Sequence, residues 1–245
     1  KSKIRGEASH GMICAEDEIG LGTSHDGILV LDTQVPNGTP AASFFDIAGD
    51  LVLEIGLTPN RADAASHWGV ARDIRAVTGL PIQLPSPALV IESNAHPIEV
   101  EVKDSGCDRF CGITIDGIQV APSPAWLQER LAAIGLRPIN NVVDITNFIC
   151  HGVGQPMHAY DWNEIKGGKL IVDSLPAGTV FKTLDGIERK LTGEELMICD
   201  ASGAIGLAGV MGGEHSSIKD STTRVFLEVA HFKPERIRKA SQTHG

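Results

Sequence analysis

The chain has 245 residues, of which 42% are hydrophobic and 21% are charged, a composition typical of a globular protein with one large or two ordinary cores. Its net charge of −10 and its 4% aromatic content exclude the basic, aromatic surface of a general RNA-binding protein, so any contact with nucleic acid is expected to be local. Composition alone favours an enzyme that acts on a small molecule.

Membrane and metal partners are not expected. No apolar run approaches the roughly 18 residues of a membrane span, and no signal peptide opens the chain. The five cysteines are odd in number and scattered, which indicates reduced thiols in a cytoplasmic protein. Cys107 and Cys111 lack a second ligand pair at the spacing of a zinc site, so no metal is predicted.

Before residue 85 the sequence predicts a few short elements. Residues 1–22 are punctuated by glycine and are typical of the end of a β-rich domain. Residues 51–57 are a strand candidate, and a helix is expected soon after it, with Asp63 as its N-cap and Gly79 as its end. Prolines between residues 81 and 97 indicate a domain boundary.

Beyond this boundary the sequence predicts mixed elements. Residues 98–103 alternate apolar and charged side chains, as a half-buried strand does. Asp116-Gly117 is expected to form a hairpin turn, and Ser123 to cap a helix with the core face Leu127, Leu131 and Ile134. A final helix begins at Pro234, and further strands are expected at 169–175, 179–184, 187–191, 196–200 and 224–230. The predicted fold class is α+β, with a small strand–helix module before a larger, mixed domain that is β-rich in its second half.

Polar and ionisable side chains gather in "NNVVDITNFICHGVGQPMHAYD", residues 140–161. If residues 141–151 are helical, the apolar face consists of Val142, Ile145 and Ile149. Thr146 then borders that face and Asn147 lies nearly opposite it. Two interpretations stay open, a solvated amphipathic helix or the wall of a cleft.

Two candidate catalytic groups follow in the same stretch. His158, in the loop after the helix, suits proton transfer or the orientation of water, although a lone loop histidine is more often structural. Cys150 beside His151 suggests a thiol nucleophile, but adjacent helical residues point about 100° apart and do not face each other.

Glu228 is an anomaly in the apolar strand "RVFLEVA". An unpaired buried charge is costly, so Glu228 is expected either to form a salt bridge or lie exposed at a sheet edge, or to await a ligand's hydrogen-bond donor. The segment "GAIGLAGVMGGEH" is either a tight turn between strands or a place where backbone amides approach a ligand. It is not a dinucleotide fingerprint, because no strand–helix crossover surrounds it.

Together these segments resemble the β subunit of bacterial phenylalanyl-tRNA synthetase. Residues 2–22 are similar to the tail of its OB-type tRNA-binding module, and "LTPNRADAASHWGVARDIRAVTG" to the small module that follows. Four further segments resemble parts of its editing domain: "RPINNVVDITNF", "GQPMHAYD", "AGVMGGEHS" and "FLEVAHF". The resemblance implies an OB-type remnant at 1–47, a small α/β module at 48–84 and an editing domain at 85–245.

The resemblance also implies a reaction and roles for its residues. Such domains hydrolyse the ester of tyrosine wrongly attached to tRNA(Phe), and the glutamate matching Glu228 is associated with recognition of the phenol hydroxyl. Gly209 and Gly212 match a glycine-rich pocket wall, and Arg137 matches an arginine near the tRNA terminus. His158, Thr146 and Asn147 match residues beside the ester and its attacking water.

Assembly and cofactors follow from the same resemblance. The expected partners are the α subunit, in an (αβ)₂ tetramer, and the acceptor end of tRNA(Phe). ATP and magnesium belong to synthesis on the α subunit, so no cofactor is expected in this chain. The chain is expected to begin inside the OB-type module and to stop before a His-Thr-Asp-Ala-type stretch that contributes to the pocket. The alternatives are a non-catalytic scaffold that positions tRNA and a cysteine hydrolase that uses Cys150.

Overall fold

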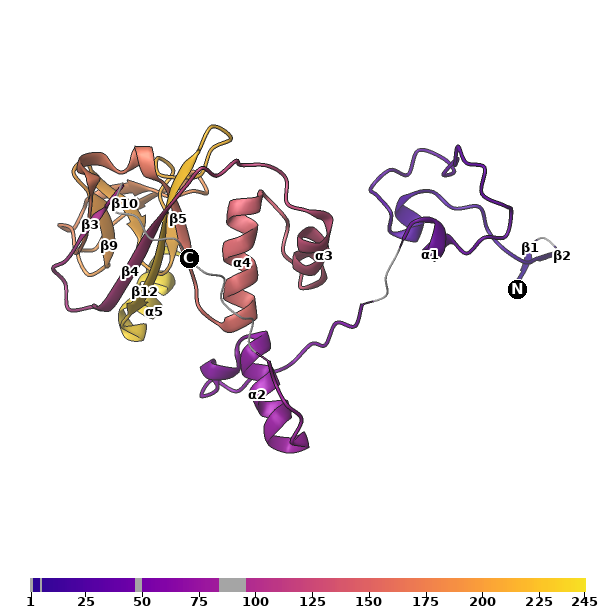
Figure 1. The fold of residues 1–245 in the computed structure, drawn as a ribbon, viewed down its shortest axis with the longest axis horizontal. Coiled ribbons are helices and arrows are strands. Elements are labelled where there is room, and N and C mark those ends of the chain that lie inside the picture. Colours follow the sequence, from indigo (N-terminus) through magenta and orange to yellow (C-terminus); the bar gives the residue numbers. More distant parts are fainter. Residues whose placement is uncertain (1, 5, 47–49, 84–95) are drawn as a thin grey trace. The chain divides into compact units, whose positions relative to one another are not determined.

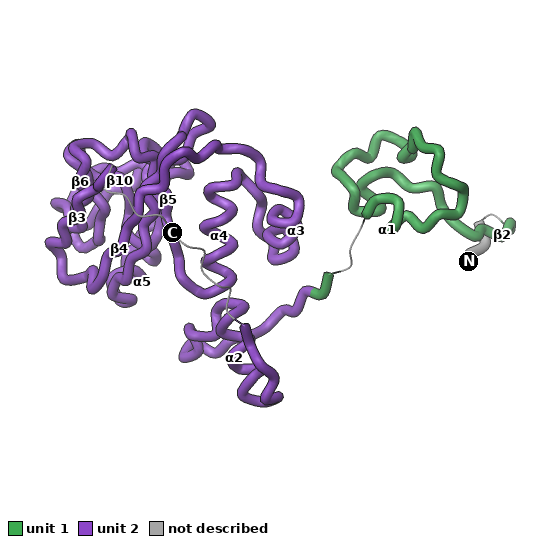
Figure 2. Tube along the Cα trace, viewed as in Figure 1, with its two compact units in different colours: residues 1–51 green, residues 52–245 purple. Residues whose placement is uncertain are grey.

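The computed structural model describes residues 2–4, 6–46, 50–83 and 96–245 (Figure 1). Its contacts divide the chain into two compact units, residues 1–51 and residues 52–245 (Figure 2). The module boundaries expected near residues 47 and 84 fall outside the described residues. The α+β fold class is confirmed, since helices and several separate sheets are present.

The first unit contains only short elements. Strand β1 (Ser2–Ile4) pairs antiparallel with β2 (Glu7–Ser9). A single 3-10 turn, η1 (Asp17–Ile19), and the short helix α1 (Ala41–Phe44) complete its regular structure among the described residues.

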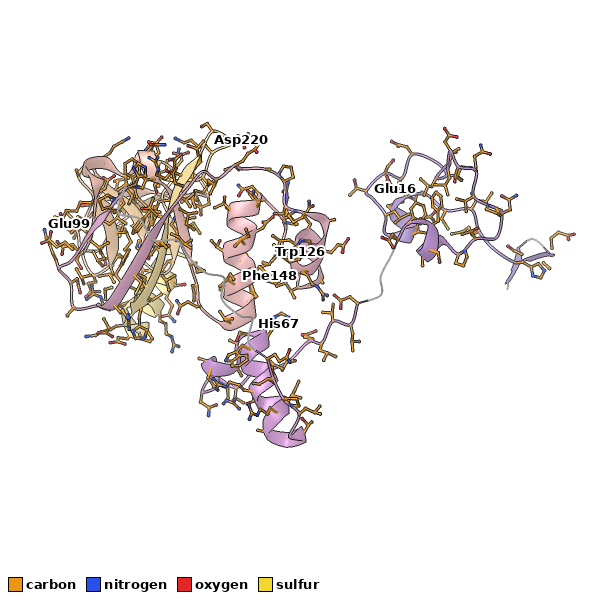
Figure 3. All side chains as sticks on the ribbon, in the orientation of Figure 1. Glu16, His67, Glu99, Trp126, Phe148 and Asp220 are labelled. Atoms are coloured by element: carbon orange, nitrogen blue, oxygen red, sulfur yellow. The ribbon has the colours of Figure 1, made fainter. Side chains whose placement is uncertain are left out.

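The second unit begins with a helical part. It contains η2 (Ala62–Ala64), α2 (His67–Thr78), α3 (Ala125–Ala133) and α4 (Asn141–Val153). The Nδ1 atom of His67 lies 3.0 Å from the backbone oxygen of His151, which joins α2 to α4. Trp126 on α3 packs edge-on against Phe148 on α4, with ring centroids 5.6 Å apart (Figure 3).

The rest of the second unit is built mainly from strands. A three-stranded antiparallel sheet has the order β4 (Cys107–Asp116), β12 (Arg224–Phe232), β5 (His158–Asp161). A five-stranded sheet has the order β11 (Met211–Gly212), β10 (Gly203–Leu207), β9 (Met197–Asp200), β6 (Lys169–Asp173), β3 (Glu99–Val102), with only β3 and β6 parallel. A small hairpin, β7 (Val180–Lys182) and β8 (Glu188–Lys190), the turns η3 (Trp162–Glu164) and η4 (Lys166–Gly168), and helix α5 (Pro234–His244) complete it.

The core lies between the two larger sheets. One buried cluster joins Tyr160 and Phe226 of the three-stranded sheet to Leu170, Val172 and Ile198 of the five-stranded sheet. A second cluster packs α5 and β7–β8 against the five-stranded sheet through Phe181, Leu191, Met197, Cys199, Leu207 and Ala240. Burial of apolar surface in these two clusters is what fixes β5, β12 and α5 around a common space.

Several local predictions are confirmed. A strand is present within residues 98–103 and at each of the five expected positions between residues 169 and 230, and a helix begins at Pro234. Gly79 ends α2 with a φ of 71°, a left-handed conformation in which glycine carries no Cβ penalty.

The predictions before residue 67 are wrong in two respects. Residues 51–57 form no strand, and apolar side chains there, such as Leu51 and Leu53, are exposed. The N-cap of α2 is Ser66, whose hydroxyl accepts a bond from Gly69 N, whereas Asp63 forms ion pairs with Arg61 and Arg72. Helix periodicity does not distinguish a cap from an acidic residue a few positions earlier.

The expected hairpin at Asp116-Gly117 is also wrong. Strand β4 ends at Asp116, but its antiparallel partner is β12, with Arg224 opposite Asp116 and Glu228 opposite Gly112. This long-range pairing replaces the local turn, and it buries Val225 and Phe226 of β12 between β4 and β5. This pairing brings Glu228 into the interior.

Helix capping near residue 123 differs from the prediction as well. Ser123 does not cap α3, because the N-cap of this helix is Pro124. The Ser123 hydroxyl instead donates a hydrogen bond of 2.5 Å to the buried Oδ2 of Asp144. Leu127 and Leu131 are buried as expected, but Ile134 is 38% exposed.

The buried face of α4 is not the one that periodicity suggests. Asp144 and Thr146 are buried, whereas Ile145 is 52% exposed. The Asp144 carboxylate is satisfied by Ser123 Oγ and by the backbone N–H of Ile139, so a polar group can occupy the interior face.

Candidate active site

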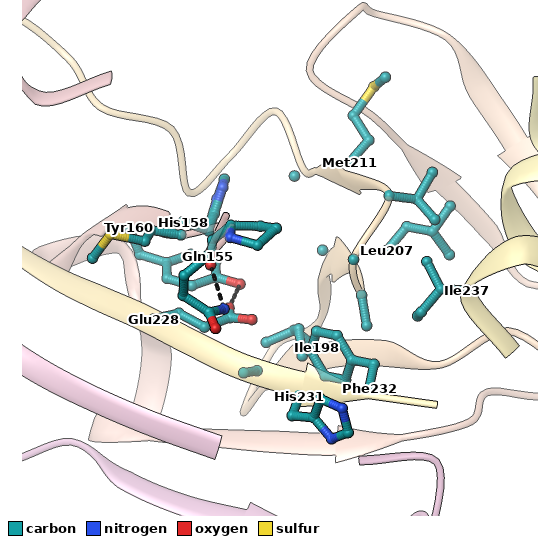
Figure 4. Close-up of a pocket in the computed structure, with 18 of the residues that line it drawn as sticks. Gln155, His158, Tyr160, Ile198, Leu207, Met211, Glu228, His231, Phe232 and Ile237 are labelled. Carbon is teal, nitrogen blue, oxygen red and sulfur yellow. Dashed lines mark hydrogen bonds between the residues drawn. The ribbon is translucent and has the colours of Figure 1, made fainter. Parts of the chain in front are cut away.

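A cavity of about 640 Å³ opens between the two larger sheets and the start of α5 (Figure 4). Strands β5 and β12 supply its polar wall, and β9, β10 and β11 supply the opposite wall. Its volume lies within the range of small-molecule binding sites, roughly 300–1,000 Å³. Residues from six elements line it, including Tyr160, Ile198, Leu207, Met211, Phe232 and Ile237.

Glu228 lies on this wall and is 6% exposed. Its Oε2 accepts a hydrogen bond of 2.6 Å from the Tyr160 hydroxyl (Figure 4). Burial raises the pKa of Glu228 to about 7, against the lowering effect of the Tyr160 bond. The carboxyl group therefore changes its protonation state near neutral pH, and its known partner is a phenol.

His158 faces Glu228 across the antiparallel pair of β5 and β12. Its ring packs edge-on against Tyr160, with centroids 4.4 Å apart. Burial lowers the pKa of His158 to about 4, so the imidazole is neutral at pH 7. Its Nε2 is buried and has no hydrogen-bond partner among the described residues, so it is an unsatisfied polar atom in the wall of the cavity.

Glycines shape the opposite wall. A Cβ on Gly212 would lie 2.6 Å from His158 Cε1 and 3.0 Å from its Nε2, so the imidazole occupies space that a side chain would fill. Gly209 has a φ of 65°, and its Cβ would lie 3.1 Å from Ile237 Cδ1. Both glycines line the cavity and let the chain pass close to the groups opposite.

The structure brings four of the predicted site residues together in this cavity: His158, Glu228, Gly209 and Gly212. The other three do not line it. Thr146 is buried within α4, where its hydroxyl donates to the Val143 carbonyl at 2.7 Å; Asn147 is half-buried and Arg137 is exposed. Their roles beside the ester remain predictions.

The thiol alternative gains no geometric support. Burial raises the pKa of the Cys150 thiol, which disfavours the reactive thiolate. No histidine lies within hydrogen-bond reach of its sulfur in the described part of the chain.

Tyr160 and Ile237 are cavity residues that the sequence reasoning did not select. Tyr160 follows His158 by two positions, so in a strand both side chains point to one face. That spacing could have identified Tyr160. Ile237 has no comparable signal, because only the packing of α5 brings it to Gly209.

Within the described ranges, no group of three or more His, Cys, Asp or Glu side chains could hold a metal ion. Over the same residues no helix is long and apolar enough to cross a membrane.

The fold and cavity define a mixed α+β domain with a buried carboxyl group in a glycine-walled pocket. Residues 106–245 match the family model described as the B3/4 domain, and the chain belongs to this family.

The whole chain is similar to phenylalanine–tRNA ligase beta subunits. It is 53% identical over 252 residues to that of Bacteroides fragilis, covering 100% of this chain and 31% of the relative. It is 46% identical over 250 residues to that of Salinibacter ruber, covering 98% of this chain and 30% of the relative. The chain thus spans about 31% of the length of the first of these relatives.

A solved structure also matches at lower similarity. It is an N-terminal fragment of the phenylalanyl-tRNA synthetase beta subunit from Pyrococcus horikoshii, 18% identical, with 73% of this chain and 55% of that chain covered. Its TM-score of 0.43 is too low to establish a shared fold.

Proposed function

We propose that this chain carries the editing site of a phenylalanine–tRNA ligase beta subunit and hydrolyses tyrosine esterified to tRNA(Phe). The observation that most strongly supports this proposal is the position of the buried Glu228 carboxyl group. It lines the cavity and already accepts a hydrogen bond from the Tyr160 phenol. A group that binds one phenol hydroxyl in this environment is chemically suited to bind another. Similarity to ligase beta subunits along the whole chain supports the same assignment.

Discrimination would come from the hydroxyl that distinguishes tyrosine from phenylalanine. A tyrosyl ester would donate its phenol hydrogen to Glu228, whereas a phenylalanyl ester would displace water and leave the carboxyl oxygen unsatisfied. Sites of this kind discriminate by roughly 10⁴-fold or more, because the unpaired polar group is costly. The apolar lining, including Ile198, Leu207 and Phe232, would contact either ring and so contribute little to the choice.

The chemistry requires an oriented water rather than a covalent nucleophile. Water attacks the activated ester carbonyl, the bond to the ribose oxygen breaks, and that oxygen leaves with a proton. His158 is neutral at pH 7 with an unpartnered Nε2, so it suits orienting the water or polarising the carbonyl. Thr146 and Asn147 are proposed to assist near the ester, although neither lines the cavity.

The non-catalytic alternative makes a different demand on Glu228. A scaffold that only positions tRNA would favour a Glu228 neutralised by arginine or lysine, with no cavity beside it. The bond to Tyr160 and the cavity of about 640 Å³ therefore support editing over this alternative.

The rest of the proposal concerns the longer protein. Its partners would be the α subunit, in an (αβ)₂ tetramer, and the acceptor end of tRNA(Phe), near which Arg137 would lie. ATP and magnesium would serve synthesis on the α subunit, in the cytoplasm. In that arrangement this chain contributes only the ester hydrolase.

The test is hydrolysis of tyrosyl-tRNA(Phe) and phenylalanyl-tRNA(Phe) by the chain and by two variants. Selective deacylation of the tyrosyl ester is expected, weakened by Glu228→Ala and by His158→Ala. Matched controls are Glu214→Ala and His215→Ala, because both side chains are exposed and outside the cavity. Equal hydrolysis of the two esters, or none, would contradict the proposal.

A further inference from the structure

Tyr160 is the chain's only tyrosine, and it is 2% exposed in the core between the two sheets. Its ring packs among apolar side chains of both sheets, a setting in which phenylalanine would bury the same ring without a polar group. The hydroxyl is satisfied by one bond, to Glu228 Oε2 at 2.6 Å. This pairing makes Tyr160 more than a packing residue.

The geometry of the bond leaves half of the carboxyl group for a ligand. A carboxyl group has two oxygens, and Tyr160 contacts only Oε2. Oε1 has no hydrogen-bond partner among the described residues, and Glu228 lines the cavity. A short bond to a rigid aromatic side chain fixes the rotation of the carboxyl group and thereby the direction of the second oxygen.

We propose that Tyr160 is a positioning residue for substrate discrimination: its hydroxyl holds Glu228 so that the second carboxyl oxygen meets the phenol of a tyrosyl ester. This inference rests on the proposed editing function. The chain's own phenol and the substrate's phenol would then share one carboxyl group, each donating to a different oxygen. The role assigned to Tyr160 is on selectivity, through its hydrogen bond to Glu228.

The electrostatic surroundings point the same way. Burial raises the pKa of Glu228, and the Tyr160 bond is the interaction that lowers it. On β5 the residue opposite Glu228 is His158, which is neutral at pH 7, and on β4 it is Gly112, which carries no charge. The Cys107 thiol, further along β4, interacts electrostatically with Glu228, and its pKa is raised chiefly by burial. Loss of the Tyr160 hydroxyl therefore leaves Glu228 protonated to a higher pH.

The decisive comparison is Tyr160→Phe with Thr222→Val. Thr222 is also buried, and its hydroxyl donates to Asp161 Oδ2 at the same 2.6 Å, but neither of these residues lines the cavity. For Tyr160→Phe we expect kcat/KM for hydrolysis of tyrosyl-tRNA(Phe) to fall about tenfold or more. The kcat/KM for hydrolysis of phenylalanyl-tRNA(Phe) should stay unchanged. The pH at which tyrosyl selectivity appears should move upward. Thr222→Val should alter neither selectivity nor its pH profile.

The outcomes separate this inference from the proposed function. If the unmodified chain does not prefer the tyrosyl ester, the proposed function and the inference both fail. If the unmodified chain prefers the tyrosyl ester, and the Tyr160→Phe and Thr222→Val variants are equally selective for it, only the role of Tyr160 is overturned. Equal losses on both esters would indicate a structural role and would also overturn it.

A second measurement needs no substitution. Because Tyr160 is the only tyrosine, biosynthetic 3-fluorotyrosine labels this position alone. Titration of the labelled chain with the 3′-amide analogue of tyrosyl-adenosine should shift the ¹⁹F resonance of Tyr160, and the phenylalanyl analogue should shift it much less. Equal shifts with the two analogues would contradict the proposal.

Discussion

His158 and Glu228 face each other across strands β5 and β12, and burial moves their pKa values in opposite directions. The pKa of His158 falls to about 4 and that of Glu228 rises to about 7. Between these values both side chains are neutral, so the pair is not a salt bridge. The pocket acquires its negative charge on Glu228 only as the pH rises through neutrality.

Glu228→Gln is expected to stabilise the fold at high pH. The folded pKa of about 7 exceeds the ordinary 4.5, so stability is lost as pH rises from 4.5 through 7. The neutral amide, which still accepts the Tyr160 bond, should recover up to roughly 3 kcal/mol at pH 8 and almost nothing at pH 4. Urea unfolding at both pH values measures this, and an equal gain at both would exclude the titration of Glu228 as its source.

His158 should titrate far below the ordinary histidine pKa of 6.5. Burial lowers its pKa from 6.5 to about 4, so folding opposes its protonation and stability falls as pH drops from 6.5 towards 4. In a ring-proton NMR titration, the His158 resonance is expected to show a midpoint near 4, and this resonance should be absent from His158→Asn. A His158 midpoint above 6 would show that water reaches the ring freely.

Gly212→Ala should displace the imidazole of His158. The added Cβ would lie 2.6 Å from His158 Cε1, so the ring must move. Hydrolysis of the tyrosyl ester should fall at least about tenfold, as expected for a displaced positioning group. Gly152→Ala is the control, because a Cβ at that position in α4 meets nothing within 4 Å. Unchanged hydrolysis in Gly212→Ala would exclude a role for the position of His158.

Glu195 should anchor α5, which carries Ile237 to the cavity. Glu195 is 3% exposed, and its carboxylate accepts bonds from the backbone N–H groups of Thr192 and Gly193 and contacts His244 Nε2 at 2.8 Å. Burial opposes ionisation, but these bonds prevail and lower the pKa to about 2. Stability from this group is present above 4.5 and is lost as pH falls through 2.

Glu195→Gln tests this anchor by thermal or urea unfolding. The variant should lose about 2 kcal/mol at pH 7, the range for hydrogen bonds to a charged group, and much less near pH 2. A loss that is equal at both pH values would indicate packing rather than ionic anchoring. Glu214→Ala, in which an exposed ion pair with Lys182 is removed, should change stability by less than about 1 kcal/mol.

By itself, the sequence determined the features that depend on neighbouring residues. The apolar run in "RVFLEVA" predicted a strand there and identified Glu228 as a carboxylate in need of a partner. Gly79 and Pro234 correctly marked a helix end and a helix beginning, because these residues have narrow backbone preferences. The α+β class followed from the order of such elements.

Only the tertiary structure decided which surfaces meet. The partner of Glu228 is Tyr160, which is 68 residues away along the chain, and no periodicity encodes that contact. Asp144 can occupy the interior face of α4 because Ser123, 21 residues earlier, donates a hydrogen bond to its carboxyl group there. The local sequence pattern reports the backbone preference of each residue and the spacing of apolar residues. Whether a buried polar group finds a hydrogen-bond partner depends instead on all the elements that pack around it.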